Sequence, residues 1–579
     1  MPKFTYQVAM PQPNSHYFEV TLTVENWQLS QLNLKMPAWT PGSYLIREYV
    51  RHLQDFAAYQ ETTQKSLNYQ KIAKNHWCIQ TPSIDKIIVF YRIYAYDLSV
   101  RTNHLDYSHG YFNGAALFFF VPDFEKFPIT LRIVPPQADW QVATGLTALP
   151  TTHSLPTFIA PDFDTLVDCP VEIGPHTRYE FQVLDKLHHF VVWGKGNLNS
   201  DRLIADLQKI ITVEANLFGG LPYDYYCFIL HLASQGYGGL EHKNSCSLIY
   251  SRFGFREPEK YQNFLQLVAH EFFHLWNIKR IRPQAIENFD YEQENYTPSL
   301  WFSEGTTSYY DLLIPLRAGI YDSNTFLKKL GQEITRFLLT PGRQVQPLAE
   351  SSFDAWIKLY RRDANSDNSQ MSYYLKGQLV TLLLDLIIRD RFQNQRSFDD
   401  VLRQMWEEFG RIEKGFTPTE LETVIAEVAQ QDLTEFFQRY LYHTEELPFN
   451  TYLAPFGLQL QAIFEEPSLP YLGIKVQSEN NKELIKFVAR HSPAEQAGLS
   501  PDDELLALNG LRVNAEHLFQ RLKDYQADDI IQITVFHQDT LRTVTVQLAA
   551  PQPSRYEVVK IQNPSNDQRK KFVGWLESP

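Results

Sequence analysis

The chain has 579 residues, too many for one hydrophobic core, so roughly two to four domains are expected. It carries 53 basic and 67 acidic residues, a net charge of −14, which disfavours nucleic acid or an anionic membrane as its main partner. Four scattered cysteines argue against a disulfide framework, and no apolar stretch is long enough to predict a membrane span. The chain begins with strand-like alternation and no secretory signal, so we expect a cytoplasmic protein.

Residues 1 to about 190 are rich in strand-forming segments. The segments 17–24, 86–93 and 129–134 hold β-branched and aromatic residues, and Pro, Gly and Asn clusters separate them. We expect an antiparallel β domain of sandwich type beside a catalytic unit. The turn-rich loop Trp39-Thr-Pro-Gly-Ser-Tyr44 could reach a neighbouring domain, although such a loop is more often only a turn.

From about residue 195 helices and strands alternate. Helical spacing covers 200–218 and 259–277, and strands are expected at 227–232 and 247–251. Beyond Trp301 the pattern is mostly helical, over 323–339, 373–392, 398–409, 418–429 and 433–442.

The stretch Val268-Ala-His-Glu-Phe-Phe-His-Leu-Trp276 carries metal-binding chemistry. His270 and His274 are four residues apart, so on a helix they lie on one face, where two imidazoles can bind one zinc ion. Glu271 lies beside the first histidine and can act on water at the metal. The same short pattern also arises by chance on buried helices, so the rest of the chain must decide. Strand, metal helix and then a helical lobe is the order of a two-lobed zinc peptidase.

A catalytic zinc needs a third protein ligand. The glutamates that follow His274 are Glu287, Glu292, Glu294 and Glu304. The first three lie in a Pro- and Asn-bearing segment without apolar periodicity, typical of a solvated loop. Glu304 follows the aromatic run at Trp301 in the first turn of a helix, so we expect it to be the ligand. The alternative is an acidic residue that only stabilises the helix N-terminus.

Residues 456–550 resemble a PDZ domain. Ser492-Pro-Ala-Glu-Gln-Ala-Gly-Leu499, the strand that starts at Asp503 and Asn509-Gly510 occur in the usual order. The resemblance implies that the loop Tyr471, Leu472, Gly473 and Ile474 binds a terminal carboxylate, and that the next strand adds a peptide. The alternative is a PDZ domain that only packs on the catalytic unit. Residues 551–579 are expected to fold back as a tail, with Trp575 as its anchor.

The segment 268–283, with Trp301-Phe-Ser-Glu-Gly305, resembles the glycyl aminopeptidase family. These proteins are gluzincin metallopeptidases related to aminopeptidase N and leukotriene hydrolase. The resemblance covers nearly the whole chain and implies a multidomain α+β protein: a β domain (1–190), a thermolysin-like α/β catalytic domain with a helical lobe (191–455), a PDZ domain (456–550) and a tail (551–579). The gap from His274 to Glu304 is longer than is usual in aminopeptidase N.

The resemblance also implies two substrate contacts. Gly238-Gly-Leu-Glu-His242 is similar to the aminopeptidase segment in which a strand edge holds the peptide and a glutamate pairs with its α-ammonium. This implies that Gly238 and Gly239 bind the substrate and that Glu241 binds its amine, although Leu240 and His242 depart from the aminopeptidase N pattern. The alternative is a glycine turn with an exposed glutamate that has no role in substrate binding.

A further segment, Met371-Ser-Tyr-Tyr-Leu-Lys-Gly377, resembles the Tyr-x-Lys-Gly segment of these peptidases. The tyrosine of that segment donates a hydrogen bond to the oxyanion of the tetrahedral intermediate. Counting from Lys376-Gly377 selects Tyr374, with Tyr373 as the second choice. A packed tyrosine at a helix start is the alternative.

Together these features predict an aminopeptidase with one zinc ion per chain, held by His270, His274 and Glu304. Its partners would be peptides with a free amino terminus, and a carboxy terminus at the PDZ groove. The family name implies a small first residue such as glycine. The alternatives are a PDZ-containing zinc endopeptidase and a binding scaffold without activity.

Overall fold

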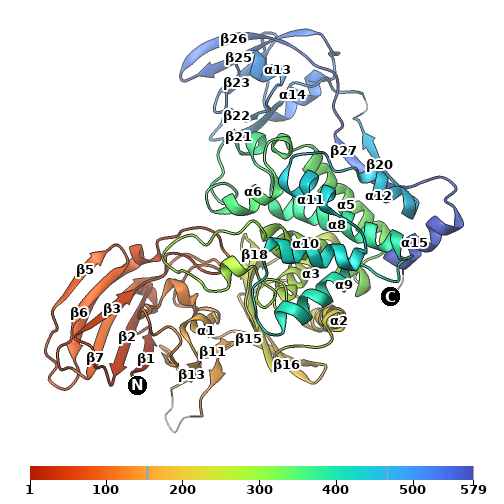
Figure 1. The fold of residues 1–579 in the computed structure, drawn as a ribbon. Coiled ribbons are helices and arrows are strands. Elements are labelled where there is room, and N and C mark those ends of the chain that lie inside the picture. Colours follow the sequence, from red (N-terminus) through yellow and green to blue (C-terminus); the bar gives the residue numbers. More distant parts are fainter. Residues whose placement is uncertain (151–154, 466, 578–579) are drawn as a thin grey trace. The chain divides into compact units, whose positions relative to one another are not determined.

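The computed structural model describes residues 1–150, 155–465 and 467–577, and the chain divides into two compact units (Figure 1). The first unit comprises Met1–Tyr296, Ala318–Ile320 and Leu402–Thr417. The second comprises Thr297–Arg317, Tyr321–Val401 and Pro418–Pro579. The β domain therefore shares a unit with the sheet that follows it, and the helical lobe shares one with the PDZ domain and the tail.

The β domain is built on a seven-stranded sheet in which buried and half-buried residues alternate. Along β2 the inward residues Phe18, Val20, Leu22 and Val24 are fully buried, as expected for strands with one face on a core. All pairs in this sheet are antiparallel except β1 and β10, which run parallel. The strands, in spatial order, are β12 (Thr147–Ala148), β13 (Thr157–Ala160), β10 (Ile129–Val134), β1 (Lys3–Ala9), β2 (Tyr17–Glu25), β7 (Lys86–Tyr94) and β4 (Leu53–Gln60).

Two smaller sheets complete the domain. The first has the order β3 (Gln31–Lys35), β6 (His76–Gln80), β5 (Tyr69–Ala73). The second has the order β11 (Gln141–Thr144), β14 (Val171–Gly174), β9 (Gly110–Phe112), β8 (His104–Leu105). The short helix α1 (Phe163–Val167) precedes β14 and is capped by Asp162.

A five-stranded mixed sheet forms the rest of the first unit, and its edge strand is β18. Its order is β15 (Thr177–Val183), β16 (Lys186–Trp193), β17 (Tyr225–Ala233), β19 (Ser245–Ser251), β18 (Tyr237–Glu241), with β18 antiparallel to β19. The central β17 is buried along almost its whole length, as strands covered on both faces are. Helices α2 (Ser200–Phe218) and α3 (Pro258–Phe273) pack on each other, and α3 also packs against β18 and β19.

The second unit contains the helical lobe. A π-helical turn, Trp301–Thr306, leads into α4 (Thr307–Arg317), and α5 (Ser323–Leu338), α8 (Tyr373–Arg391) and α10 (Pro418–Ala429) follow. The segment Ser366–Arg391 is long and apolar enough to cross a membrane, but 83% of its most apolar window is buried inside the protein. It therefore has the character of a core helix.

The tail folds back as predicted. Strand β27 (Arg555–Lys560) pairs with β20 (Leu458–Ile463) and packs on α5. Helix α15 (Asn566–Leu576) buries Trp575, whose Nε1–H donates to the Tyr309 hydroxyl at 3.2 Å.

The PDZ domain has its own core and an exposed sheet edge. Its sheet runs β21 (Ile474–Glu479), β22 (Lys482–Val488), β23 (Glu504–Leu508), β25 (Ile530–His537), β26 (Thr540–Gln547), and helix α14 (Ala515–Leu522) contacts β21. Asn368 joins it to the helical lobe, donating to the Val488 carbonyl at 2.9 Å and accepting from the Arg490 N–H at 2.9 Å. The multidomain α+β architecture is confirmed.

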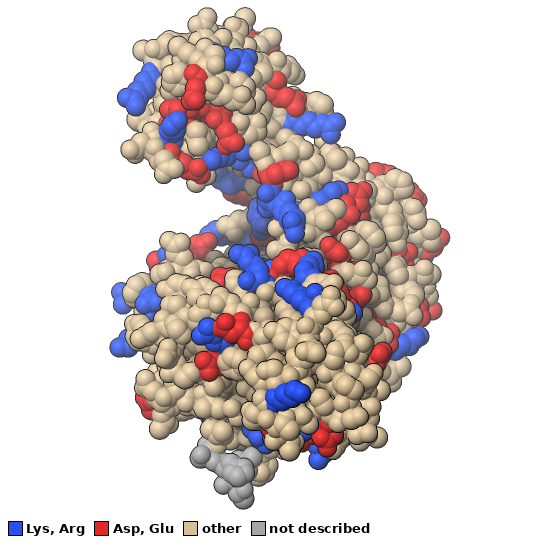
Figure 2. Space-filling model, turned by 90° about the vertical axis from the view of Figure 1, so that its left-hand side faces the viewer, with Lys and Arg blue, Asp and Glu red and all other residues tan. Residues whose placement is uncertain are grey.

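On the face shown in Figure 2, basic and acidic residues are interspersed and uncharged residues cover most of the surface. Negative charges therefore interrupt the positive ones on this face.

Candidate metal and peptide site

Helix α3 places two histidine rings side by side. The centroids of His270 and His274 are 4.6 Å apart, and each ring offers a nitrogen within 4.8 Å of the other's. The helix ends at Phe273 rather than at the predicted Asn277. Nδ1 of His274 lies 2.9 Å from the Asn277 carbonyl oxygen, and Ile278 has a positive φ of 93°. The chain therefore turns back immediately after the second histidine.

This arrangement fits a zinc ion. Because Nδ1 of His274 carries the hydrogen that bonds Asn277, its Nε2 keeps a lone pair for a metal. Two imidazoles from adjacent helical turns are a usual part of a catalytic zinc site.

The edge strand β18 runs close beneath Glu271. A Cβ atom on Gly239 would lie 2.2 Å from the carboxyl carbon of Glu271, so only glycine allows this approach. Oxygens of Glu241 and Glu271 and a nitrogen of His274 all lie within 4.8 Å of one another, and all three residues are buried. The strand edge and the metal helix thus converge on one small polar volume. The exposed glycine turn considered as an alternative for Glu241 is wrong.

The β domain also reaches this volume, through the loop 39–44. Gly42 has φ +85°, and a Cβ there would lie 2.5 Å from one carboxylate oxygen of Glu241. The loop is held by Trp39, whose Nε1–H donates to the Asp290 carbonyl at 2.8 Å, and by Thr40, whose hydroxyl donates to Asn113 at 3.2 Å. The prediction that this loop can reach a neighbouring domain is confirmed.

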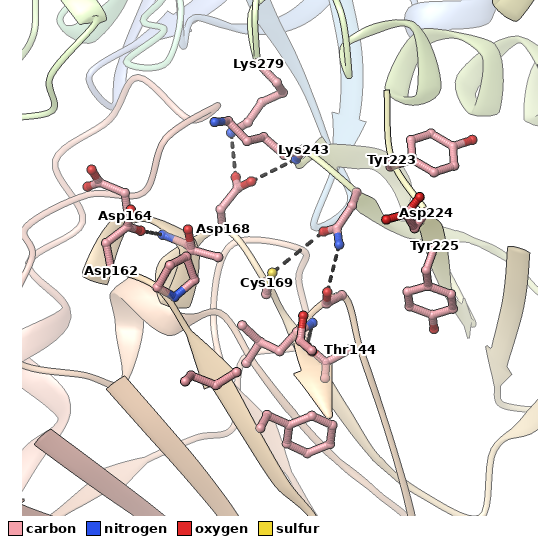
Figure 3. Close-up of a pocket in the computed structure, with 18 of the residues that line it drawn as sticks. Thr144, Asp162, Asp164, Asp168, Cys169, Tyr223, Asp224, Tyr225, Lys243 and Lys279 are labelled. Atoms are coloured by element: carbon pink, nitrogen blue, oxygen red, sulfur yellow. Dashed lines mark hydrogen bonds and ion pairs between the residues drawn. The ribbon is translucent and has the colours of Figure 1, made fainter. Parts of the chain in front are cut away.

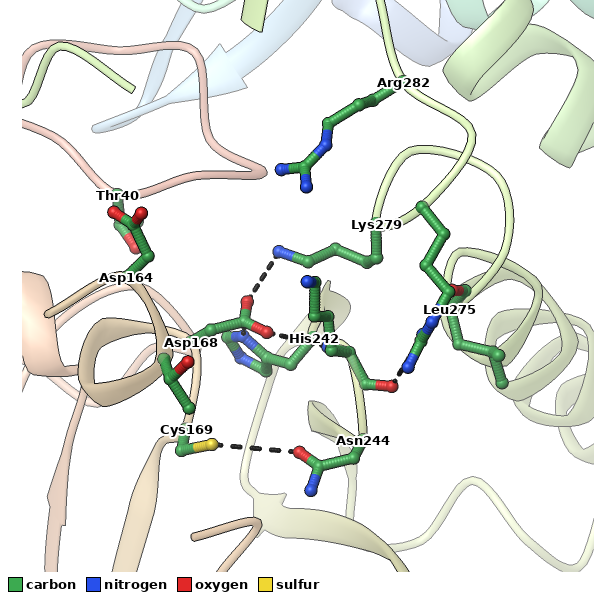
Figure 4. Close-up of polar contacts among 12 residues, drawn as sticks. Thr40, Asp164, Asp168, Cys169, His242, Asn244, Leu275, Lys279 and Arg282 are labelled. Carbon is green, nitrogen blue, oxygen red and sulfur yellow. Dashed lines mark hydrogen bonds and ion pairs between the residues drawn. The ribbon is translucent and has the colours of Figure 1, made fainter. Parts of the chain in front are cut away.

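Asp168 fixes the chain where it leaves β18 (Figure 4). Its Oδ1 lies 2.6 Å from the ammonium of Lys279 and 3.2 Å from Nδ1 of His242, and its Oδ2 accepts from the Lys243 N–H at 2.8 Å. Burial alone would raise the pKa of Asp168, but Lys279 and His242 outweigh it and hold that pKa well below its usual value. Asp168 therefore holds His242 and Lys243, the two residues that follow Glu241.

A cavity of about 980 Å³ lies beside this network (Figure 3). Basic and acidic side chains both line this cavity. Some of them form ion pairs with each other, such as Lys243 with Glu413 and Lys126 with Asp164. Pro41 lines this cavity, and its neighbour Gly42 contacts Glu241.

A second group of buried histidines in the first unit is joined by hydrogen bonds, although Nδ1 of His231 has no partner among the described residues. Glu172 bonds Nδ1 of His109 at 2.9 Å and Nε2 of His231 at 3.0 Å, and His104 lies 2.9 Å from His109. Burial alone would raise the pKa of Glu172, but the two imidazoles lower it to about 2. This network links β8 and β14 of the β domain to β17 of the neighbouring sheet.

In the second unit, two glycines bring the π-helical turn against α8. A Cβ on Gly305 would lie 2.5 Å from the Cα of Gly377, and a Cβ on Gly377 would lie 2.6 Å from the Trp301 carbonyl. This crossing places half-buried Tyr374 in the field of buried Glu304. Burial raises the pKa of Tyr374, and the charge of Glu304 raises it further. Tyr373 is fully buried and stacks on Tyr374.

The loop predicted to bind a carboxylate precedes β21 in the PDZ domain. Gly473 has φ +88°, and the Leu472 and Gly473 carbonyls accept from the N–H groups of Ala494 and Ala489. The N–H of Tyr471 donates to the Ala549 carbonyl at 3.0 Å, so that donor is already used inside the domain.

The sequence matches three family models. The Peptidase M61 N-terminal domain matches residues 5–175, M61 glycyl aminopeptidase matches 263–380, and a PDZ domain matches 470–548. No curated protein matches the sequence.

Two solved structures place these matches in context. An aminopeptidase N family protein from Idiomarina loihiensis is 32% identical over 100% of both chains, with a TM-score of 0.93. A variant of an M1 zinc metallopeptidase from Deinococcus radiodurans is 15% identical over 77% of this chain and 95% of that chain, with a TM-score of 0.50, a likeness of fold. The chain belongs to the M61 glycyl aminopeptidase family, a family of peptidases.

Proposed function

We propose that the enzyme hydrolyses the amino-terminal peptide bond of peptides with a small first residue, using one zinc ion held by His270, His274 and Glu304. The observation that carries this proposal is the convergence of Glu241, Glu271 and His274 within 4.8 Å at the edge of β18. In this arrangement Glu241, which would bind the substrate amine, lies beside Glu271, which would accept the proton of the attacking water.

Zinc, when bound, supplies a Lewis acid that polarises the scissile carbonyl and makes water more acidic. Glu271 takes the proton from the attacking water and gives it to the leaving amine. Gly239 leaves the space in which Glu271 can approach the substrate backbone.

Glu304 and Tyr374 are proposed as the third ligand and the oxyanion donor. Both lie in the segment 263–380 that matches the glycyl aminopeptidase model, which also contains both histidines. The pairing of Gly305 with Gly377 supports a shared role, since it fixes two functional side chains on helices whose backbones touch. A single oxyanion donor contributes about 2.7–4 kcal/mol in comparable sites.

Glu241 is proposed to bind the α-ammonium of the substrate and so to select chain ends. A buried carboxylate is stable only with a cationic or hydrogen-bonded partner, and the ammonium supplies three donors. Gly42 lies against this carboxylate and limits the space beyond the amine. This contact disfavours the endopeptidase alternative, which needs a cleft that stays open past Glu241. The preference for glycine or another small first residue rests on the family name.

The PDZ domain is proposed to bind a peptide carboxy terminus along β21. Its support is the position of β21 at the sheet edge beside α14, the arrangement by which a peptide adds as an extra strand.

The test compares glycyl chromogenic peptides with free and with acetylated amino termini, with and without a chelator. We expect turnover of the free peptide only, its loss with the chelator and its return with zinc. Turnover of the acetylated peptide would favour the endopeptidase, and activity that resists chelation would contradict the zinc mechanism.

A further inference from the structure

A second group from the β domain reaches the edge of β18. Nη2 of Arg101 donates to the carbonyl oxygen of Gly239 at 3.1 Å. Gly239 also lies against Glu271, the proposed general base. The guanidinium therefore bonds the same residue of β18 that Glu271 contacts.

The backbone that carries Arg101 is held firmly. The Tyr49 hydroxyl donates to the Arg101 carbonyl at 2.8 Å, and the Arg101 N–H donates to Ser99 at 3.2 Å. The preceding Val100 carbonyl lies 3.2 Å from the hydroxyl of Tyr111, which also bonds Ser247 on β19. The guanidinium is thus positioned relative to the sheet by its own loop.

The charge of Arg101 has no counterion among the residues that the structure describes. The described ion pairs do not include Arg101, and its buried Nε–H has no hydrogen-bond partner. Among the described residues of the first unit, only Nη1 of Arg101 comes within 4 Å of the position that a Cβ on Gly238 would take. A guanidinium of this kind is a ready partner for a planar anion, because its paired N–H groups match a carboxylate.

The spacing along β18 matches a short peptide. Glu241, for the amine, and Gly239, which contacts Arg101, are two residues apart, about 6.8 Å in an antiparallel strand. An extended dipeptide separates its ammonium and carboxylate by a similar length, about two residues of chain. A longer peptide added to this edge would also compete with Arg101 for the Gly239 carbonyl.

We infer that Arg101 binds the free α-carboxylate of the second residue, so that the preferred substrates are dipeptides with both ends free. This inference rests on the proposed function and specifies its substrate class. Glu241 and Arg101 then recognise the two opposite charges at the ends of one small molecule.

The experiment measures kcat/KM for glycyl-leucine and for glycyl-leucine amide, which differ only in the terminal charge. We expect the wild-type enzyme to favour the free acid about ten-fold or more, the usual range for a charge-assisted bond. Arg101→Gln keeps a polar side chain but lacks the charge, so it should bring the acid-to-amide ratio near one, with a much larger loss for the acid than for the amide. Arg101→Lys should restore part of the preference.

Arg178→Gln is the matched control, because Arg178 also donates to a backbone carbonyl, that of Val142 at 3.2 Å. It should keep the wild-type ratio. A wild-type ratio near one, or an equal loss of both substrates in Arg101→Gln, would show that Arg101 only supports the strand. Failure of the wild-type enzyme to cleave either substrate, with added zinc, would instead contradict the proposed function.

Discussion

The protein has two sheet edges at which we propose peptide binding: β18 for a dipeptide with both ends free, and β21 for the carboxy terminus of a longer chain. At β18 the proposed binding groups are side chains: Glu241 for an amine and Arg101, from the β domain, for a carboxylate. At β21 the proposed reading group is a backbone loop around Gly473, with helix α14 alongside. At β18, side chains from distant segments can enclose a small molecule such as a dipeptide. At β21, the open strand beside a helix can accept a longer peptide.

The supports of the two edges differ in the same way. Three partly buried polar contacts to Asp168 fix the exit of β18, and Gly42 closes against Glu241. The PDZ domain joins the helical lobe through Asn368 and an ion pair of Lys475 with Asp367, in which the ammonium is 67% exposed. An exposed pair of this kind contributes little, about 0–1 kcal/mol. The edge at which we propose the chemistry is therefore held by polar groups that are better shielded from water.

The largest expected effect is a loss of kcat in Glu271→Gln without a loss of zinc or peptide binding. Glu271→Gln keeps the size of the side chain but removes the proton acceptor, so kcat should fall about 10²- to 10⁴-fold. Zinc content, measured by atomic emission, and peptide binding at the PDZ domain should not change. A variant with wild-type kcat would show that another group takes the proton.

The next effect concerns the recognition of the substrate's amino terminus at β18. Glu241→Gln leaves the α-ammonium without its buried counterion, a loss of roughly 2–5 kcal/mol, or about 30-fold or more in kcat/KM. The loss should apply to peptides with a free amine and should narrow their advantage over acetylated peptides. An unchanged ratio of free to acetylated turnover would remove Glu241 from amine binding.

The sequence predicted the parts of this site that lie close together along the chain. The spacing of His270 and His274, the neighbouring Glu271 and the helix beyond Trp301 all follow from local patterns. Gly238 to Glu241 and the PDZ segments required a resemblance, because no periodicity marks a substrate edge.

The remaining parts depend on contacts between distant residues. Gly42, Arg101 and Asp168 come from the β domain, and nothing in their neighbouring residues distinguishes them from ordinary loop residues. The early end of α3 depends on the bond from His274 to Asn277, and the π-helical turn at Glu304 accompanies a tight packing of Gly305 on Gly377. Helical propensity alone predicts a continuous α-helix at both places.

Gly42→Ala tests how tightly the β domain closes the amine end of β18. A methyl group there meets Glu241 and forces a left-handed backbone on alanine, so we expect KM for glycyl peptides to rise roughly ten-fold with a smaller change in kcat. Gly319→Ala is the matched control, since Gly319 has φ +67° and open space around it. Equal effects of the two substitutions would mean that backbone strain, and not the contact with Glu241, sets KM.

The smallest effect on turnover is expected at the other edge. Gly473→Ala places a methyl group 2.2 Å from the Cβ of Ser492 at a positive φ, so the loop before β21 must move. We expect dipeptide hydrolysis to stay within about two-fold, because surface changes away from a site rarely matter more. Binding of a fluorescent peptide with a free carboxy terminus, measured by anisotropy, should weaken about ten-fold or more. Gly510→Ala shares the positive φ but has open space around it, and it should leave binding intact. A loss of dipeptide turnover in Gly473→Ala alone would mean that the two edges are coupled, and that the PDZ domain takes part in catalysis as well as in binding.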